Sequence, residues 1–105
     1  MALEHRWSQR KRVCLDALVF HRLPGMLQAS ILDISLEGAF IRGEHLVLPP
    51  QANVELTFAL EVDGKRTINH IEALLIHSTH NGHGVMFKDF RVSAYHALKG
   101  LLNAA

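Results

Sequence analysis

The chain has 105 residues, of which 49% are hydrophobic and 20% are charged. This length matches a single domain, and the composition is typical of a folded globular protein and excludes a largely disordered one. The formal net charge is only +1, so the bulk charge gives no indication of a DNA or RNA partner. We therefore expect one small globular domain.

The chain contains no run of about eighteen apolar residues, so we expect no membrane insertion. Its first residues are polar and charged, unlike a secretory signal, and the expected location is cytoplasmic. The single cysteine, Cys14, stands between Val13 and Leu15 and is expected to be a small buried hydrophobic residue. A lone cysteine is consistent with a reducing compartment.

Residues 1–12 lack apolar periodicity and are predicted to form a flexible N-terminal arm. This arm contains one acid, Glu4, and four Lys or Arg side chains: Arg6, Arg10, Lys11 and Arg12. Such a run is as consistent with solvated surface charge as with binding of an anion.

Residues 13–88 are predicted to form a β-barrel because turn signals recur at short intervals between alternating apolar residues. The expected strands cover residues 13–20, 26–34, 39–41, 54–62, 67–80 and 84–87. Asp63-Gly64 and Asn81-Gly82 are two-residue hairpin signals, whose turn needs positive φ at both positions. The stretch 67–80 is long for one strand, so we expect a bend near His70.

The hydrophobic period changes near the end of the chain, where residues 89–103 are predicted to form an α-helix. One stripe of that helix contains Val92, Tyr95, Leu98, Leu101 and Leu102. Asp89 or Ser93 is expected to cap its start. Short hairpin-linked strands usually close to protect their edges. The predicted fold is therefore all-β, a small six-stranded antiparallel barrel with one C-terminal α-helix.

Two short motifs carry the chemistry: Arg6-Trp7-Ser8-Gln9-Arg10 in the arm and Asp33-Ile34-Ser35-Leu36-Glu37-Gly38 after the second strand. A guanidinium binds phosphate or the O6 and N7 atoms of guanine, and a carboxylate accepts the N1–H and N2–H donors of guanine. Asp33 and Ser35 are expected to point outward, with Ile34 in the core. Together the motifs predict a site for an anionic guanine nucleotide. The alternative for Asp33 and Ser35 is bonding to their own backbone.

The two motifs resemble those of the PilZ domain family, which pairs R-x-x-x-R in an N-terminal arm with D/N-x-S-x-x-G on the barrel. Residues 82–89 are also similar to the last barrel strand of the family, and the resemblance covers essentially the whole chain as a single PilZ domain. It implies a PilZ-type barrel that binds cyclic di-GMP. The contacts that it implies come from Arg6, Arg10, Asp33, Ser35 and Gly38, and candidates for additional contacts are His5, Trp7, Ser8, Gln9, Lys11 and Arg12.

The resemblance implies a bacterial receptor that binds cyclic di-GMP, a second messenger, between arm and barrel and signals to an unidentified partner protein in motility or biofilm control. The alternative is a PilZ-like adaptor that binds no nucleotide. A barrel for single-stranded DNA or RNA is disfavoured, because most of the seven aromatic residues fall on core parities. The sequence leaves three alternatives open. The ligand is bound as one molecule or as a stacked pair, the protein is a monomer or a homodimer, and Trp7 stacks on the ligand or only anchors the arm.

No catalytic residues are expected, because the chain has no nucleophile elbow, phosphate loop or prominent pair of carboxylates. His77, His80 and His83 are spaced three apart, but no cysteine or clear carboxylate completes a ligand set. We therefore expect no metal site and no cofactor, and we expect exposed imidazoles. The chain is interpreted as a sensor, not an enzyme.

Overall fold

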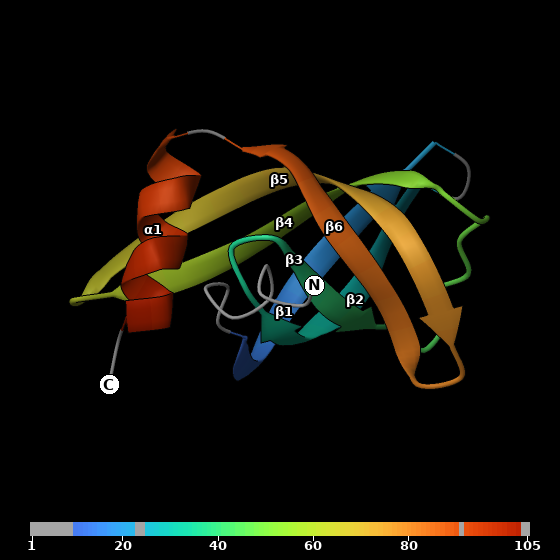
Figure 1. Cartoon of the computed structure of the whole chain (residues 1–105), viewed down its shortest axis with the longest axis horizontal. Coiled ribbons are helices and arrows are strands. Elements are labelled where there is room, and N and C mark those ends of the chain that lie inside the picture. The colour runs from blue at the N-terminus through green and yellow to red at the C-terminus, as the bar shows by residue number, and fades with distance from the viewer. Residues whose placement is uncertain (1–9, 23–24, 91, 104–105) are drawn as a thin grey trace, which may run out of the picture.

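The computed structural model describes residues 10–22, 25–90 and 92–103. Within them, antiparallel strands form a closed barrel in the order β1-β2-β3-β6-β5-β4, followed by one helix (Figure 1). The bounds are β1 Lys11–His21, β2 Gly25–Ile34, β3 Gly38–Arg42, β4 Asn53–Val62, β5 Lys65–Thr79, β6 Gly82–Phe90 and α1 Val92–Asn103. The predicted six-stranded barrel with a C-terminal helix is confirmed. The strands extend over residues 11–90 instead of 13–88, and the helix starts at Val92 instead of residue 89.

Alternation along the strands builds the core. In β4, Val54, Leu56, Phe58 and Leu60 are at most 4% exposed, while Asn53, Glu55 and Glu61 face solvent. The other strands complete the interior with Val19, Ile31, Ile41, Ile71 and Val85. Each fully buried side chain of this size contributes about 1.5–3 kcal/mol of hydrophobic stabilisation.

The alternation also places Cys14 on the outside. The even-numbered side chains of β1 face solvent along the whole strand. Cys14 is one of them and is exposed, so the expectation that it is buried is wrong. Strand parity overrides the apolar character of its neighbours. Phe20 shares this parity and is 44% exposed, which also departs from the expected core position of the aromatic residues.

One predicted hairpin turn is confirmed and the other is shifted. Asp63 and Gly64 have φ values of 54° and 76°, as the turn between β4 and β5 requires. In the next hairpin Thr79 pairs with Gly82, so the turn residues are His80 and Asn81 instead of Asn81-Gly82. Neither His80 nor Asn81 has a positive φ, whereas Gly82, at the start of β6, has a φ of 152°.

Replacing Gly64 with alanine is expected to lower the free energy of unfolding by about 1–2 kcal/mol, because a Cβ is disfavoured at positive φ. A Cβ there would meet no atom within 4 Å, so backbone strain is the whole effect. Urea denaturation followed by circular dichroism measures the change. Lys65→Ala, at the exposed neighbouring position, should leave the midpoint unchanged. An unchanged midpoint for Gly64→Ala would contradict this assignment of the turn.

β5 is regular at His70 itself, where a bend is expected, and its irregularities begin two residues farther along the strand. β5 pairs with β4 in unbroken register from Lys65 to Leu74, and His70 lies within that ladder. The irregularities lie on the other edge, against β6, between Glu72 and Ala73 and between Leu75 and His77. Bulges of this kind increase strand twist and allow a long strand to follow the barrel wall.

The helix covers the ends of β4 and β5 near the turn that connects them (Figure 1). Ala94 and Leu98 are buried, but Tyr95 is 37% exposed and lies off the buried stripe to which it was assigned. At the C-terminal turn, Lys11 Nζ donates a hydrogen bond of 3.2 Å to the carbonyl oxygen of Leu101. The start of β1 is therefore tied to the end of α1. No helix in the described residues is long and apolar enough to cross a membrane.

Candidate functional site

A bulge in β2 directs Asp33 outward. Ile31 is fully buried and pairs with Ile41 of β3, whereas Asp33 pairs with Phe40, so Leu32 is an extra residue in the ladder. Without this extra residue, Asp33 would point into the barrel as Ile31 does. With the extra residue, Ile34 is fully buried and Asp33 lies on the outer wall. The predicted orientation of Asp33 and Ile34 is confirmed.

Asp33 meets Arg10 on this wall. Arg10 Nε lies 3.3 Å from Asp33 Oδ1, and the two side chains are 59% and 29% exposed. Within the described residues, the terminal guanidinium nitrogens of Arg10 and the second carboxylate oxygen of Asp33 make no further hydrogen bond. Arg12 is exposed and pairs with Asp33 across the β1–β2 ladder. Arg12 is therefore a direct neighbour of Asp33 in the strand register, closer to the site than its place among the additional candidates indicated.

Ser35 does not point outward with Asp33. It is 2% exposed, and its Oγ accepts hydrogen bonds from the backbone N–H groups of Glu37 (3.1 Å) and Gly38 (3.2 Å). The same hydroxyl lies 3.3 Å from the carbonyl oxygen of Gly38, to which it donates. The expected outward orientation is wrong because β2 ends at Ile34 and Ser35 starts the turn. The local backbone bonding considered as the alternative is what Ser35 shows, whereas the Asp33 carboxylate contacts Arg10.

Gly38 completes this turn and packs against β6. The N–H of Ser35 donates to the carbonyl of Gly38 at 2.9 Å, and the N–H of Phe87 donates to the carbonyl of Glu37 at 2.8 Å. A Cβ at Gly38 would overlap the carbonyl oxygen of Val85. Only glycine allows the two backbones to approach this closely. In this structure Ser35 and Gly38 shape the turn, and Asp33 presents its functional group outward.

The remaining predicted contacts divide into two groups. His5, Arg6, Trp7, Ser8 and Gln9 lie outside the described residues. Lys11 is described, and its amino group contacts the C-terminal turn of α1. Alternation at the start of β1 therefore places Lys11 with the helix and Arg12 with Asp33.

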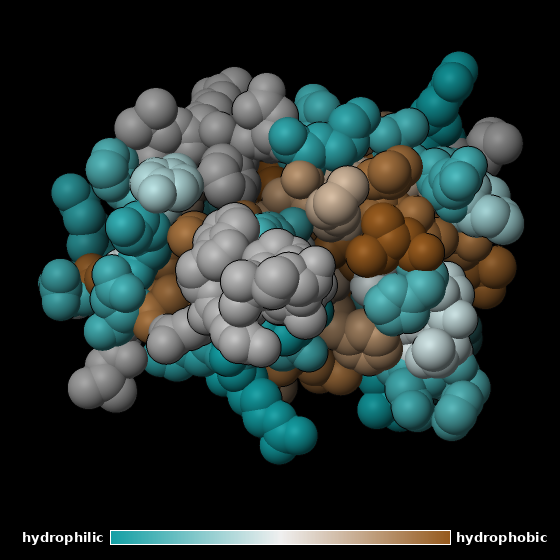
Figure 2. Space-filling model, in the orientation of Figure 1, coloured by the Kyte–Doolittle hydropathy of each residue, from teal (hydrophilic) through white to brown (hydrophobic). Residues whose placement is uncertain are grey.

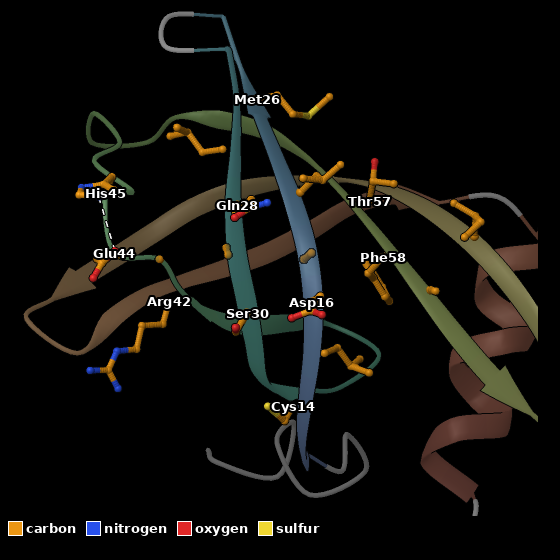
Figure 3. Close-up of a pocket in the computed structure, with 18 of the residues that line it drawn as sticks. Cys14, Asp16, Met26, Gln28, Ser30, Arg42, Glu44, His45, Thr57 and Phe58 are labelled. Carbon is orange, nitrogen blue, oxygen red and sulfur yellow. Dashed lines mark ion pairs between the residues drawn. The ribbon is translucent and has the colours of Figure 1, made fainter.

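A second feature of the outer surface is an open groove of about 880 Å³ along β1 and β2 (Figure 3). Asp16 of β1 and Ser30 of β2 pair across it, and Cys14 and Arg42 also line it. Asp33 and Ser35 do not line this groove. The groove is therefore a different surface from the one that the two motifs predict.

His83 has hydrogen-bond partners at both ring nitrogens within the described residues. His83 lies 3.0 Å from the carbonyl oxygen of Leu46 through Nε2 and 2.7 Å from Ser78 Oγ through Nδ1. This ring links the β5–β6 hairpin to the loop before β4. Among the described residues, no group of three or more His, Cys, Asp or Glu side chains is placed to hold a metal ion.

Two solved structures have a fold similar to that of this chain. The PilZ domain of CeSA from a cellulose-synthesizing bacterium aligns with a TM-score of 0.65 at 16% identity, over 90% of this chain and 94% of that chain. The chain has a PilZ-type fold. MotI/DgrA, an inhibitor of motility from Bacillus subtilis, aligns with a TM-score of 0.75 at 14% identity, over 95% of this chain and 52% of its own length. This chain therefore spans about half of MotI/DgrA.

No family model matches the sequence, and no curated protein matches it. The likeness to the two solved structures concerns the PilZ-type fold alone. The ligand has to be argued from the side chains of the site.

Proposed function

We propose that this chain is a receptor for cyclic di-GMP, which it binds on the outer wall of its PilZ-type barrel at the start of β1 and the end of β2. The observation that carries the proposal is the contact between Arg10 and Asp33, which joins the two motifs at 3.3 Å across 23 residues of sequence. It supports an exposed site where a cationic group and a guanine-reading carboxylate lie together.

The ion pair between Arg10 and Asp33 is suited to replacement by a ligand. Both partners are partly exposed, and exposed pairs of this kind contribute only about 0–1 kcal/mol to stability. Cyclic di-GMP carries two phosphodiesters, which the guanidiniums of Arg10 and Arg12 would bind through paired N–H donors. Its guanine presents N1–H and N2–H, which the Asp33 carboxylate would accept.

Ser35 and Gly38 support this site through the backbone. The three contacts of the Ser35 hydroxyl hold the turn that follows Asp33, and Gly38 anchors that turn against β6. A carboxylate held on a rigid strand end loses less entropy on binding than one on a loose loop. Arg6 of the first motif is included in the proposal as a further phosphate contact.

Isothermal titration of the full chain with cyclic di-GMP tests the proposal. We expect saturable binding, whose stoichiometry distinguishes one ligand from a stacked pair. Cyclic di-AMP is the matched control and should bind at least tenfold more weakly, because the Watson–Crick edge of adenine places an acceptor where guanine places the N1–H donor. Absence of heat with both ligands would overturn the receptor and favour the adaptor that binds no nucleotide.

The proposed role is a sensor and not an enzyme, because the site presents groups that recognise a ligand. The ligand would bring the residues before β1 onto the wall and change the surface offered to a partner protein. We propose that this occurs in the cytoplasm of a bacterium, in control of motility or biofilm formation.

A further inference from the structure

Two aromatic rings lie next to each other on the outer wall of the barrel. The ring centroids of Phe40 in β3 and His77 in β5 are 6.3 Å apart, and their planes differ by 31°. The strand between them, β6, has glycine at positions 82 and 84. The two rings thus reach toward each other across a strand that offers no side chains at these positions.

The glycines of β6 allow the rings to rest on the backbone. A Cβ at Gly84 would overlap the His77 imidazole, and a Cβ at Gly82 would lie 2.7 Å from Cε2 of Phe40. His77 is exposed and Phe40 is partly exposed, so both side chains offer surface to a ligand. Phe40, His77 and the two glycines form an aromatic surface on the outer wall, called here the ring platform.

The ring platform adjoins the candidate site through the strand register. Asp33 pairs with Phe40 across β2 and β3, Phe40 pairs with Gly84 across β3 and β6, and Gly84 pairs with His77 across β6 and β5. Paired residues of neighbouring strands share one face of a sheet. Asp33, Phe40 and His77 therefore form one row over the outer wall, with neighbouring strands about 5 Å apart.

We propose that the ring platform stacks a guanine base of the ligand while Asp33 binds the edge of the same base. A base stacked on Phe40 would present one edge toward β2, the neighbouring strand that carries Asp33. This inference rests on the proposed function and adds a stacking residue to it. Base stacking on an aromatic side chain is tolerant of sequence, so Phe40 would supply affinity and Asp33 would supply the choice of guanine.

Titration of Phe40 variants with cyclic di-GMP tests the ring platform. Phe40→Leu is expected to weaken binding roughly fivefold to a hundredfold, the range for losing one stacked base. Phe40→Tyr keeps a flat ring and should bind within about twofold of the original chain. Phe20→Leu is the matched control, because Phe20 is an exposed phenylalanine near the far end of β1 and pairs with Met26. It should bind normally.

A second measurement distinguishes a lost ligand contact from a variant that fails to fold. In the complex, nuclear Overhauser contacts are expected between the guanine H8 proton and the ring protons of Phe40. His77→Ala removes an exposed ring, is expected to fold normally and should weaken binding severalfold. If the original chain binds the ligand but Phe40→Leu and His77→Ala bind equally well, the ring platform is overturned and the receptor stands. If the original chain binds no cyclic di-GMP, both proposals fall.

Discussion

Asp33→Ala is expected to weaken cyclic di-GMP binding roughly tenfold to a hundredfold, the effect of losing one bidentate contact to a base. The variant should lose affinity without losing folding stability. Asp33 lies on the outer wall, and its partner Arg10 is 59% exposed and stays hydrated without it. The variant should therefore keep the folding stability of the original chain within about 1 kcal/mol.

Replacing Arg10 with alanine is expected to weaken cyclic di-GMP binding by a similar factor, and a lysine variant separates the role of the charge from that of the planar guanidinium. Arg10→Ala removes both the cation and the planar fork, whereas Arg10→Lys keeps the charge and loses the fork. If Arg10 binds phosphate or guanine bidentately, the lysine variant should remain well below the affinity of the original chain. The losses in Arg10→Ala and Asp33→Ala should not add in the double variant, because the two side chains contact each other.

The titrations of the Asp33 and Arg10 variants need a control variant that lies away from the site. Glu55→Ala removes an exposed carboxylate of β4 that pairs with Phe20, far from Asp33 along β1, and should leave the affinity unchanged. Calorimetric titration of all variants at one salt concentration gives the comparison, since binding of phosphates by arginine weakens as salt increases. Normal affinity in both Asp33→Ala and Arg10→Ala would place the ligand elsewhere.

Substitutions in the turn after β2 are expected to act on stability first. Gly38→Ala should lower the free energy of unfolding by about 3 kcal/mol, because the added Cβ overlaps the backbone oxygen of Val85 and neither strand can move freely. Ser35→Ala should cost about 1–3 kcal/mol, because it leaves the N–H groups of Glu37 and Gly38 without their acceptor.

Urea denaturation measures both changes, with Ser30→Ala as the control for the serine. Ser30 lies on β2 and lines the groove of Figure 3, where its hydroxyl has no hydrogen bond within the described residues. Its midpoint should not change. A Ser35→Ala variant with normal stability but lost affinity would contradict the structural role and make the hydroxyl a direct ligand contact. Affinity and stability falling together would agree with the turn supporting Asp33.

The outer surface also carries a group of exposed apolar side chains. Figure 2 shows apolar surface gathered over β5 and β6 on the side away from α1, and the exposed apolar side chains of these strands include Ile76 and Met86. Ile76 lies at the irregularity between Leu75 and His77. Because His77 belongs to the ring platform, a ligand stacked there would lie beside this apolar surface.

The candidate site could be predicted only in part. Arg10 and Asp33 were found from the spacing of the two motifs, and the structure joins them. Burial of Ser35 was not predicted, because strand alternation gives no information on where a strand ends. Neither motif contains Phe40 or His77, so the motifs do not point to them. A signal was present in β6, where glycines at 82 and 84 leave room for rings from both neighbours, but it has meaning only once the strand order is known.

The sequence by itself determined the barrel, the helix and most strand positions, because alternation, the helical period and turns such as Asp63-Gly64 are local properties of the chain. The tertiary structure alone decided that Ser35 is buried and how β2 turns Asp33 outward beside Arg10. One extra residue at Leu32 reverses the parity of everything after it, and that bulge is defined by pairing with β3. The same holds for Ser35 and Phe40, since the surroundings of a side chain depend on strands that its neighbours in the sequence do not specify.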